Sequence, residues 1–199
     1  MARLRENPEV RRAQILDAAI LLLGEQGFHG LTVQRLAQRC GVSNAGLLHY
    51  FPSKDEILLG VLDELERREA DIVVPLIAAA ADKASEGAGA SRGLVLQLLR
   101  SMLERFAARP DLGRFLVVMQ AEALDTRHLA HRWFRDREAM TIDLFADLLA
   151  TLVAEPRTIA RQLVALLYGL GQIWLRGDRD FDLLATWDSA VAALIPERR

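Results

Sequence analysis

Small and polar side chains gather in one short stretch, which reads GVSNAGLLHYFPSK over residues 41–54. An asparagine amide can pair with adenine through two hydrogen bonds, and an alanine methyl can meet the methyl group of thymine. Asn44 and Ala45 are therefore candidates for contact with base edges. Hydroxyl, imidazole and ammonium groups bind phosphate oxygens. The candidates for phosphate contact are Thr32, His49, Tyr50 and Lys54.

A short helix before this stretch is predicted to hold it in place. Apolar residues recur at helical spacing over Val33–Cys40. Thr32 stands where a hydroxyl can cap the first turn of that helix. Gly41 follows the last periodic residue and can adopt the left-handed backbone that ends a helix.

A second short helix is predicted over Asn44–Tyr50, with Ser43 as its cap. Leu47 is expected to face the core, and the small residue Gly46 is expected to lie outward beside the candidate base contacts. Because the outward residues are small, the backbone of this helix can approach base edges closely. Two such helices joined by a short glycine-containing turn are typical of the DNA-binding helix-turn-helix.

This segment resembles the DNA-binding signature of the TetR family of transcriptional regulators. The matching stretch, over residues 31–58, is LTVQRLAQRCGVSNAGLLHYFPSKDEIL. The resemblance implies a helix-turn-helix domain over residues 1–53 and an effector-binding and dimerisation domain over residues 54–199. Two positions depart from the family, which often has a small hydroxyl residue in place of Gly46 and a tyrosine in place of Leu48. Leu48 cannot donate a hydrogen bond to a phosphate.

Charge is distributed unevenly along the 199 residues. Residues 1–50 carry six arginines against four acidic residues, a net charge of +2, whereas the whole chain has −2. A basic N-terminal part followed by an acidic remainder is typical of a protein that contacts nucleic acid through its N-terminal part alone. Arg3 and Arg5 are expected on an arm that reaches toward a groove.

Helices are predicted almost throughout, which gives an all-α fold of about nine helices. No alternating strand pattern persists, and a loop is expected over residues 83–93, where the sequence is rich in Gly, Ala and Ser. The helices expected besides the two above are Glu9–Gln26, a helix capped by Ser53 that continues past Ala70, Leu94–Ala108, Pro110–Leu124, His131–Ala154, Thr158–Arg176 and Asp182–Leu194.

The last two predicted helices carry broad apolar faces, which indicate a homodimer. By resemblance, the corresponding helices of each subunit form a four-helix interface. Packing within one subunit is the alternative, and it must account for part of these residues. The residues expected at the interface are Leu163, Leu167, Leu170, Trp174, Leu184, Trp187 and Val191.

Bulky side chains on the middle helices are candidates for the walls of a small-molecule pocket, since the family encloses an effector there. Each is also an ordinary type of core residue. The candidates are Met102, Phe106, Phe115, Met119, Glu122, Trp133, Tyr168 and Trp174. A buried Glu122 would favour a cationic or hydrogen-bond-donating ligand.

Asp125, His128 and His131 have the spacing and the side-chain types of metal ligands. Histidines at a helix junction are more often surface or capping groups, so the prediction includes no metal and no cofactor. A single cysteine, Cys40, excludes internal disulfides and fits a reducing cytoplasm. The longest apolar run, near residues 163–175, is too short and too broken to span a membrane.

The sequence thus predicts a ligand-responsive, homodimeric regulator of transcription that binds a double-stranded DNA operator, in the cytoplasm and away from membranes. Release of a repressor from its operator by an unidentified small molecule is the expected mechanism. The alternative is an all-helical enzyme or metal-binding bundle with no role on DNA. No nucleophile–base pair, glycine-rich phosphate loop or paired di-iron motif is present to support that alternative.

Overall fold

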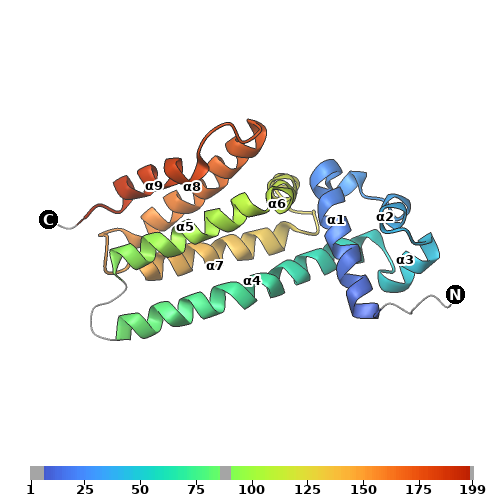
Figure 1. The fold of residues 1–199 in the computed structure, drawn as a ribbon, viewed down its shortest axis with the longest axis horizontal. Coiled ribbons are helices and arrows are strands. Elements are labelled where there is room, and N and C mark those ends of the chain that lie inside the picture. Colours follow the sequence, from blue (N-terminus) through green and yellow to red (C-terminus); the bar gives the residue numbers. More distant parts are fainter. Residues whose placement is uncertain (1–6, 86–90, 198–199) are drawn as a thin grey trace. The chain divides into compact units, whose positions relative to one another are not determined.

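The computed structural model describes the backbone of residues 7–85 and 91–197, and the side chains of residues 7–71 and 91–197. All regular structure in those ranges is helical, which confirms the predicted all-α class (Figure 1). Arg3, Arg5 and the centre of the expected loop lie outside the described residues. The helices are α1 (Pro8–Gly30), α2 (Val33–Cys40), α3 (Asn44–Tyr50), α4 (Lys54–Ser85), α5 (Arg92–Ala108), α6 (Pro110–Glu122), α7 (His131–Leu149), α8 (Pro156–Arg176) and α9 (Leu183–Leu194).

The chain forms two compact units. Unit 1 comprises residues 1–68 and 114–132, and unit 2 comprises residues 69–113 and 133–199. Both α4 and α6 therefore contribute residues to both units. The boundary predicted after residue 53 divides the chain by expected function, and as a functional boundary it stays a prediction.

Unit 1 is built on a core shared by α1, α2, α3 and the first turns of α4. Residues spaced three or four apart on α1 lie on the buried side, as expected for a helix with one apolar face. Leu36 of α2, Leu47 of α3 and Leu58 of α4 are all fully buried. These leucines anchor the two short helices, which have few residues with which to form a core of their own.

The end of α1 is bent at Gly27, one residue beyond the expected helix end at Gln26. Gly27 has φ 69° and ψ −179°, a conformation that essentially only glycine adopts. Helical hydrogen bonding resumes beyond this kink as far as Gly30. The carboxylate of Glu122 accepts a hydrogen bond of 2.9 Å from the backbone N–H of Phe28. A side chain from the last residue of α6 thus satisfies a backbone donor that the kink leaves free.

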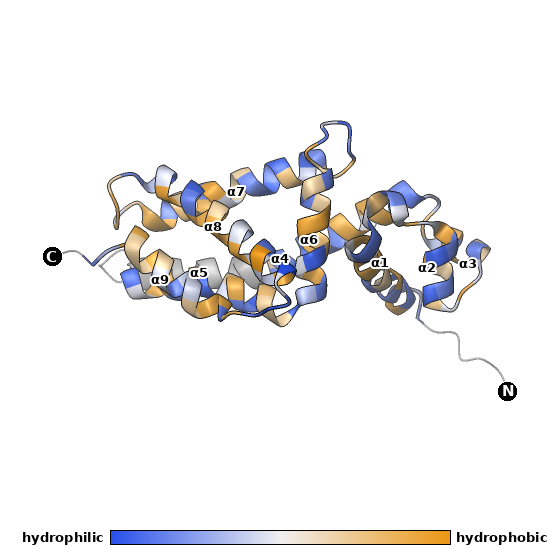
Figure 2. Ribbon diagram, turned by 90° about the horizontal axis from the view of Figure 1, so that it is seen from above, coloured by the Kyte–Doolittle hydropathy of each residue, from blue (hydrophilic) through white to orange (hydrophobic). Residues whose placement is uncertain are grey.

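Unit 2 is a bundle in which α5, α7, α8 and α9 surround one apolar core. Helix α8 carries both hydrophobic and hydrophilic residues (Figure 2), as expected for a helix with one buried face. Buried residues of all four helices form that core, with Ile195 beyond α9: Val95, Leu99, Leu103, Phe145, Leu149, Ala160, Leu163, Val164, Trp174, Leu183, Trp187, Val191 and Ile195.

The junction between α7 and α8 differs from the prediction. The first of these helices ends at Leu149 rather than Ala154, and the second begins at Pro156 rather than Thr158. Proline fits the first helical position because its missing N–H would have no partner there. Pro156 therefore opens α8, two residues before the expected start at Thr158.

Candidate nucleic-acid interface

Three local devices hold α2 and α3 as a helix-turn-helix. The hydroxyl of Thr32 accepts a hydrogen bond of 3.2 Å from the backbone N–H of Arg35, and that of Ser43 accepts one of 3.0 Å from Gly46. Gly41 lies between the helices with φ 66° and ψ 30°, in the left-handed region. Both caps and the glycine turn are confirmed as predicted.

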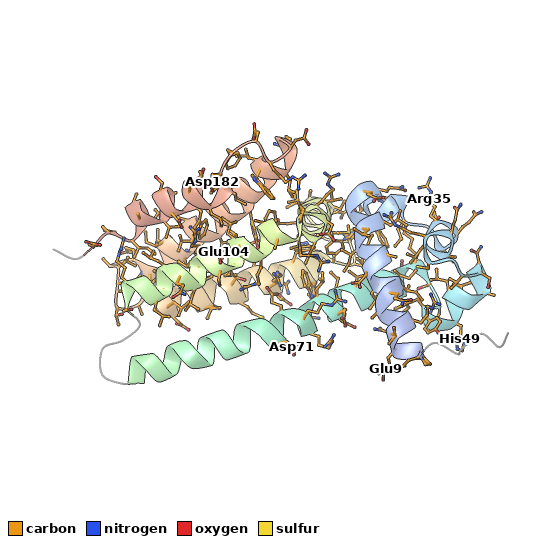
Figure 3. All side chains as sticks on the ribbon, viewed as in Figure 1. Glu9, Arg35, His49, Asp71, Glu104 and Asp182 are labelled. Atoms are coloured by element: carbon orange, nitrogen blue, oxygen red, sulfur yellow. The ribbon has the colours of Figure 1, made fainter. Side chains whose placement is uncertain are left out.

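The turn leaves one side of α3 open to solvent. Leu47 faces the core and is fully buried, whereas Asn44, Ala45 and Leu48 are exposed. His49, which Figure 3 labels, is exposed as well, and its ring meets that of Tyr50 edge to face at 5.7 Å. Gly46 and Tyr50 are intermediate in exposure. The residues predicted to contact DNA from this helix therefore share an accessible surface.

Lys54 lies at the start of α4 and is held against the end of α1. The hydroxyl of Ser53 caps α4 by accepting a hydrogen bond of 3.1 Å from the backbone N–H of Glu56. The ammonium nitrogen of Lys54 is 4.2 Å from the centre of the Phe28 ring and 3.5 Å from the carbonyl oxygen of His29. This placement fixes the charge beside the helix-turn-helix; contact with phosphate stays a prediction.

The helix-turn-helix segment, as far as Lys54, carries only positively charged side chains. Between Leu31 and Lys54 there are three cationic side chains and no carboxylate, a net charge of +3 with histidine neutral. One of the three, Arg39, donates two hydrogen bonds of 2.8 and 2.9 Å to the carboxylate of Glu25 on α1. These hydrogen bonds hold the pKa of Glu25 below its ordinary value. The remaining cations, Arg35 and Lys54, carry the positive potential that suits a polyanion.

Cys40 ends α2 and is half-buried. Burial raises the pKa of its thiol, and this effect outweighs the opposite influence of Arg11 and Arg39.

Glu122, whose role as a polar group of a ligand pocket stays a prediction, makes contacts within the protein. Besides its hydrogen bond with Phe28, its carboxylate oxygen lies 3.7 Å from Nε2 of His128. The ring of His128 in turn meets that of Phe28 edge to face, with centres 5.3 Å apart. No local sequence signal marks this cluster, because Phe28 and Glu122 are 94 residues apart.

The other candidate pocket residues are divided between the units. Phe115 and Met119 are fully buried in unit 1. Met102, Phe106, Tyr168 and Trp174 belong to or pack against the core of unit 2, and Trp133 of that unit is partly exposed. Phe106 is tightly enclosed, since a Cβ atom added at Gly113 or Gly171 would lie 2.8 Å from its ring. Their role as ligand walls stays a prediction.

Part of the predicted dimer interface needs correction. Leu163, Trp187 and Val191 are fully buried within the single chain, and Trp174 is nearly so. A side chain already covered by its own bundle has no surface to bury against a partner. Leu167, Leu170 and Leu184 are only partly buried, and Ile173, which lies on the apolar face predicted for α8, is 55% exposed.

Asp125, His128 and His131 each have a different partner. The carboxylate of Asp125 accepts hydrogen bonds from the side chain of Arg127 at 2.9 and 3.1 Å. Nδ1 of His128 accepts one from the backbone of Ala130 at 3.2 Å, and Nδ1 of His131 is 2.8 Å from the carbonyl oxygen of Ala123. Among the described side chains, those of residues 7–71 and 91–197, no group of three potential metal ligands comes together. Over residues 7–85 and 91–197 no helix is long and apolar enough to cross a membrane.

Comparison with known proteins gives matches to regulators of transcription. The family model for bacterial regulatory proteins of the tetR family matches residues 15–61. The transcriptional regulator BetI of Rhizobium meliloti is 38% identical over 72 residues, which are 36% of this chain and 36% of BetI. The match thus spans about a third of the length of such curated relatives.

Solved structures match over nearly the whole chain. A TetR transcription regulator from Haloarcula marismortui has a TM-score of 0.71 at 21% identity, covering 94% of this chain and 97% of its own. The regulator FadR from Bacillus subtilis, solved with stearoyl-CoA, has a TM-score of 0.64 at 18% identity, covering 94% of this chain and 99% of its own. At these identities the likeness establishes the fold. Over residues 15–61, which include the helix-turn-helix, the chain is similar to bacterial regulatory proteins of the tetR family.

Proposed function

We propose that this chain is a sequence-specific DNA-binding regulator of transcription, which acts as a homodimeric repressor and leaves its operator when a small molecule binds. The observation that carries the proposal is the exposed side of α3. Asn44, Ala45 and His49 are accessible there, while the buried Leu47 and the cap at Ser43 fix the helix. A helix presented in this way can enter the major groove and contact base edges.

Apolar surface left on α8 and α9 supports the homodimer. Leu167, Leu170 and Leu184 remain partly exposed, and Ile173 is 55% exposed. A second copy would cover these side chains through the same surface on each chain, as two-fold interfaces do. Two recognition helices would then meet two half-sites about 34 Å apart, so the operator should be palindromic.

The proposed response to a small molecule is a shift between two populations of the dimer. One population has the recognition helices at the spacing that the operator requires, and the other does not. An effector that binds unit 2 more tightly in the second population would lower the affinity of the dimer for its operator. The decrease is limited by the ratio of the effector's affinities for the two populations. Because α4 supplies residues to both units, a change in its position is the proposed link.

Selection of binding sites from random double-stranded DNA by the full-length protein tests the proposal. Enrichment of one palindromic sequence is expected, with affinity that falls steeply as salt rises. Asn44→Ala should change which bases are selected. Tyr50→Phe and Lys54→Ala should weaken binding to all sequences by a similar factor, because phosphate contacts carry no sequence information. Failure of the wild-type protein to enrich any sequence would refute the proposed function.

A further inference from the structure

Leu48 is an exposed leucine on the outer side of α3. Its side chain is 40% exposed, while its neighbour Leu47 is fully buried. Leu48 follows Asn44 by four residues and Ala45 by three, and residues at those spacings lie side by side on a helix. The leucine therefore belongs to the same surface as the residues proposed to contact base edges.

The side chains of α3 favour A·T pairs. The helix, which reads NAGLLHY, has no arginine or lysine that could bind guanine and no carboxylate that could accept from cytosine. Its asparagine suits adenine. Its exposed alanine and leucine suit the C5 methyl of thymine, the one apolar group on the major-groove edges.

The surroundings of Leu48 indicate a nucleic acid as its partner. The segment from Leu31 to Lys54 carries a net charge of +3 and no carboxylate, which complements a polyanion. An apolar protein partner would need a contiguous patch of several hundred Å². Instead, the exposed residues beside Leu48 are the polar Asn44 and His49 and the small Ala45.

We infer that Leu48 determines specificity by reading the methyl group of a thymine in each operator half-site. This inference rests on the proposed function and adds to it the base that the leucine recognises. The contact would bury one methyl group on each half-site. Burial of one such group changes an affinity by about fourfold.

The experiment removes that methyl group alone. The full-length protein first selects its sites from random DNA, and each thymine of the selected half-site is then replaced by deoxyuridine in turn. Deoxyuridine keeps the hydrogen-bonding groups of thymine and lacks only the methyl. Dissociation constants at fixed salt are measured for the wild type, Leu48→Ala and Leu59→Ala. Leu59 is a matched control, since it is 38% exposed and lies on α4 rather than α3.

At one thymine, replacement by deoxyuridine should lower the affinity of the wild type and of Leu59→Ala by about fourfold per half-site. The same replacement should leave the affinity of Leu48→Ala almost unchanged. An equal loss in all three proteins would overturn the inference, as would a selected half-site without thymine. A third outcome is that Leu48→Ala binds weakly, and neither it nor the wild type distinguishes thymine from deoxyuridine. The leucine would then contact the sugar or stabilise α3, and the inference would again be wrong. Failure to select any site is a different result, because it refutes the proposed function itself.

Discussion

The two units hold their key residues by different means. In unit 1, α2 and α3 are positioned by local interactions with the backbone: the helix caps at Thr32 and Ser43 and the left-handed turn at Gly41. In unit 2, four helices are held by an apolar core of large side chains, of which Trp187 is the largest among those almost fully buried. Caps and turns fix the backbone of a short exposed helix, and they thereby fix the direction in which its side chains point. A core of interlocking side chains instead fixes how the four helices of unit 2 pack together.

The largest expected effect is in the core of unit 2. Trp187→Ala should lower the free energy of unfolding by about 3–5 kcal/mol, because it removes a fully buried indole. Ile173→Ala is the control, since the side chain of Ile173 is 55% exposed. This variant should change the free energy of unfolding little and should weaken self-association. Urea unfolding followed by circular dichroism and sedimentation measures both. If Trp187→Ala only dissociated a dimer without loss of stability, the core assignment would be wrong.

A backbone substitution should disturb unit 1 almost as much. In Gly27→Ala the new Cβ would collide with the Glu122 carboxylate, in a conformation that non-glycine residues avoid. We expect a loss of about 2–4 kcal/mol. Gly93→Ala is the control, because a Cβ there meets nothing within 4 Å. All three tryptophans lie in unit 2, so fluorescence follows that unit while circular dichroism follows both. Equal stability of the two variants would contradict the described kink.

A pair of helix caps separates stability from function. The hydroxyl of Ser43 caps α3, and the carboxylate of Asp182 caps α9 by accepting a hydrogen bond of 2.9 Å from Ala185. Ser43→Ala and Asp182→Ala should each cost about 1 kcal/mol of stability. DNA affinity should fall in Ser43→Ala alone, because only that cap positions the proposed recognition helix. Similar losses of affinity in both variants would mean that α3 depends on general stability rather than on its own cap.

The smallest effect is expected at the ion pair of α1 and α2. The pKa of Glu25 is lowered by its hydrogen bonds with Arg39, so the pair stabilises the folded state above the carboxyl's ordinary pKa of 4.5. That contribution disappears as the pH falls through the lower pKa of the folded state. Both side chains are more than a third exposed, which limits the contribution to less than about 1 kcal/mol.

Glu25→Gln should therefore differ from the wild type at pH 7 and converge with it in acid. Thermal unfolding between pH 3 and pH 7 measures this difference. Asp143→Asn is a matched control, since Asp143 forms an exposed ion pair with Arg157 in unit 2. A difference at pH 7 that persisted below the folded pKa would show that the substitution acts through packing rather than charge.

How far the sequence predicted the molecule depends on the range of each interaction. Caps at Thr32 and Ser43 and the left-handed Gly41 act within four residues, and all were predicted correctly. The hydrogen bond from Phe28 to Glu122 spans 94 residues, so no local sequence pattern predicted it.

The same limit applies to burial. Apolar periodicity showed that one face of α8 and α9 is covered, but it does not tell whether the cover is the chain's own bundle or a second copy. Leu163 and Trp187 were therefore expected at a dimer interface, although the chain itself buries them. The pocket candidates have the same ambiguity, because the side chains that line a cavity are those that fill a core.

The burial of Cys40 has a consequence for oxidative chemistry. Thiols react with peroxides and disulfides as thiolates, and a raised pKa keeps this one protonated at neutral pH. Since it is the only cysteine of the chain, no partner thiol is available within the molecule to form a disulfide. Cys40 should thus react slowly with mild oxidants, although it lies beside the segment that would meet DNA.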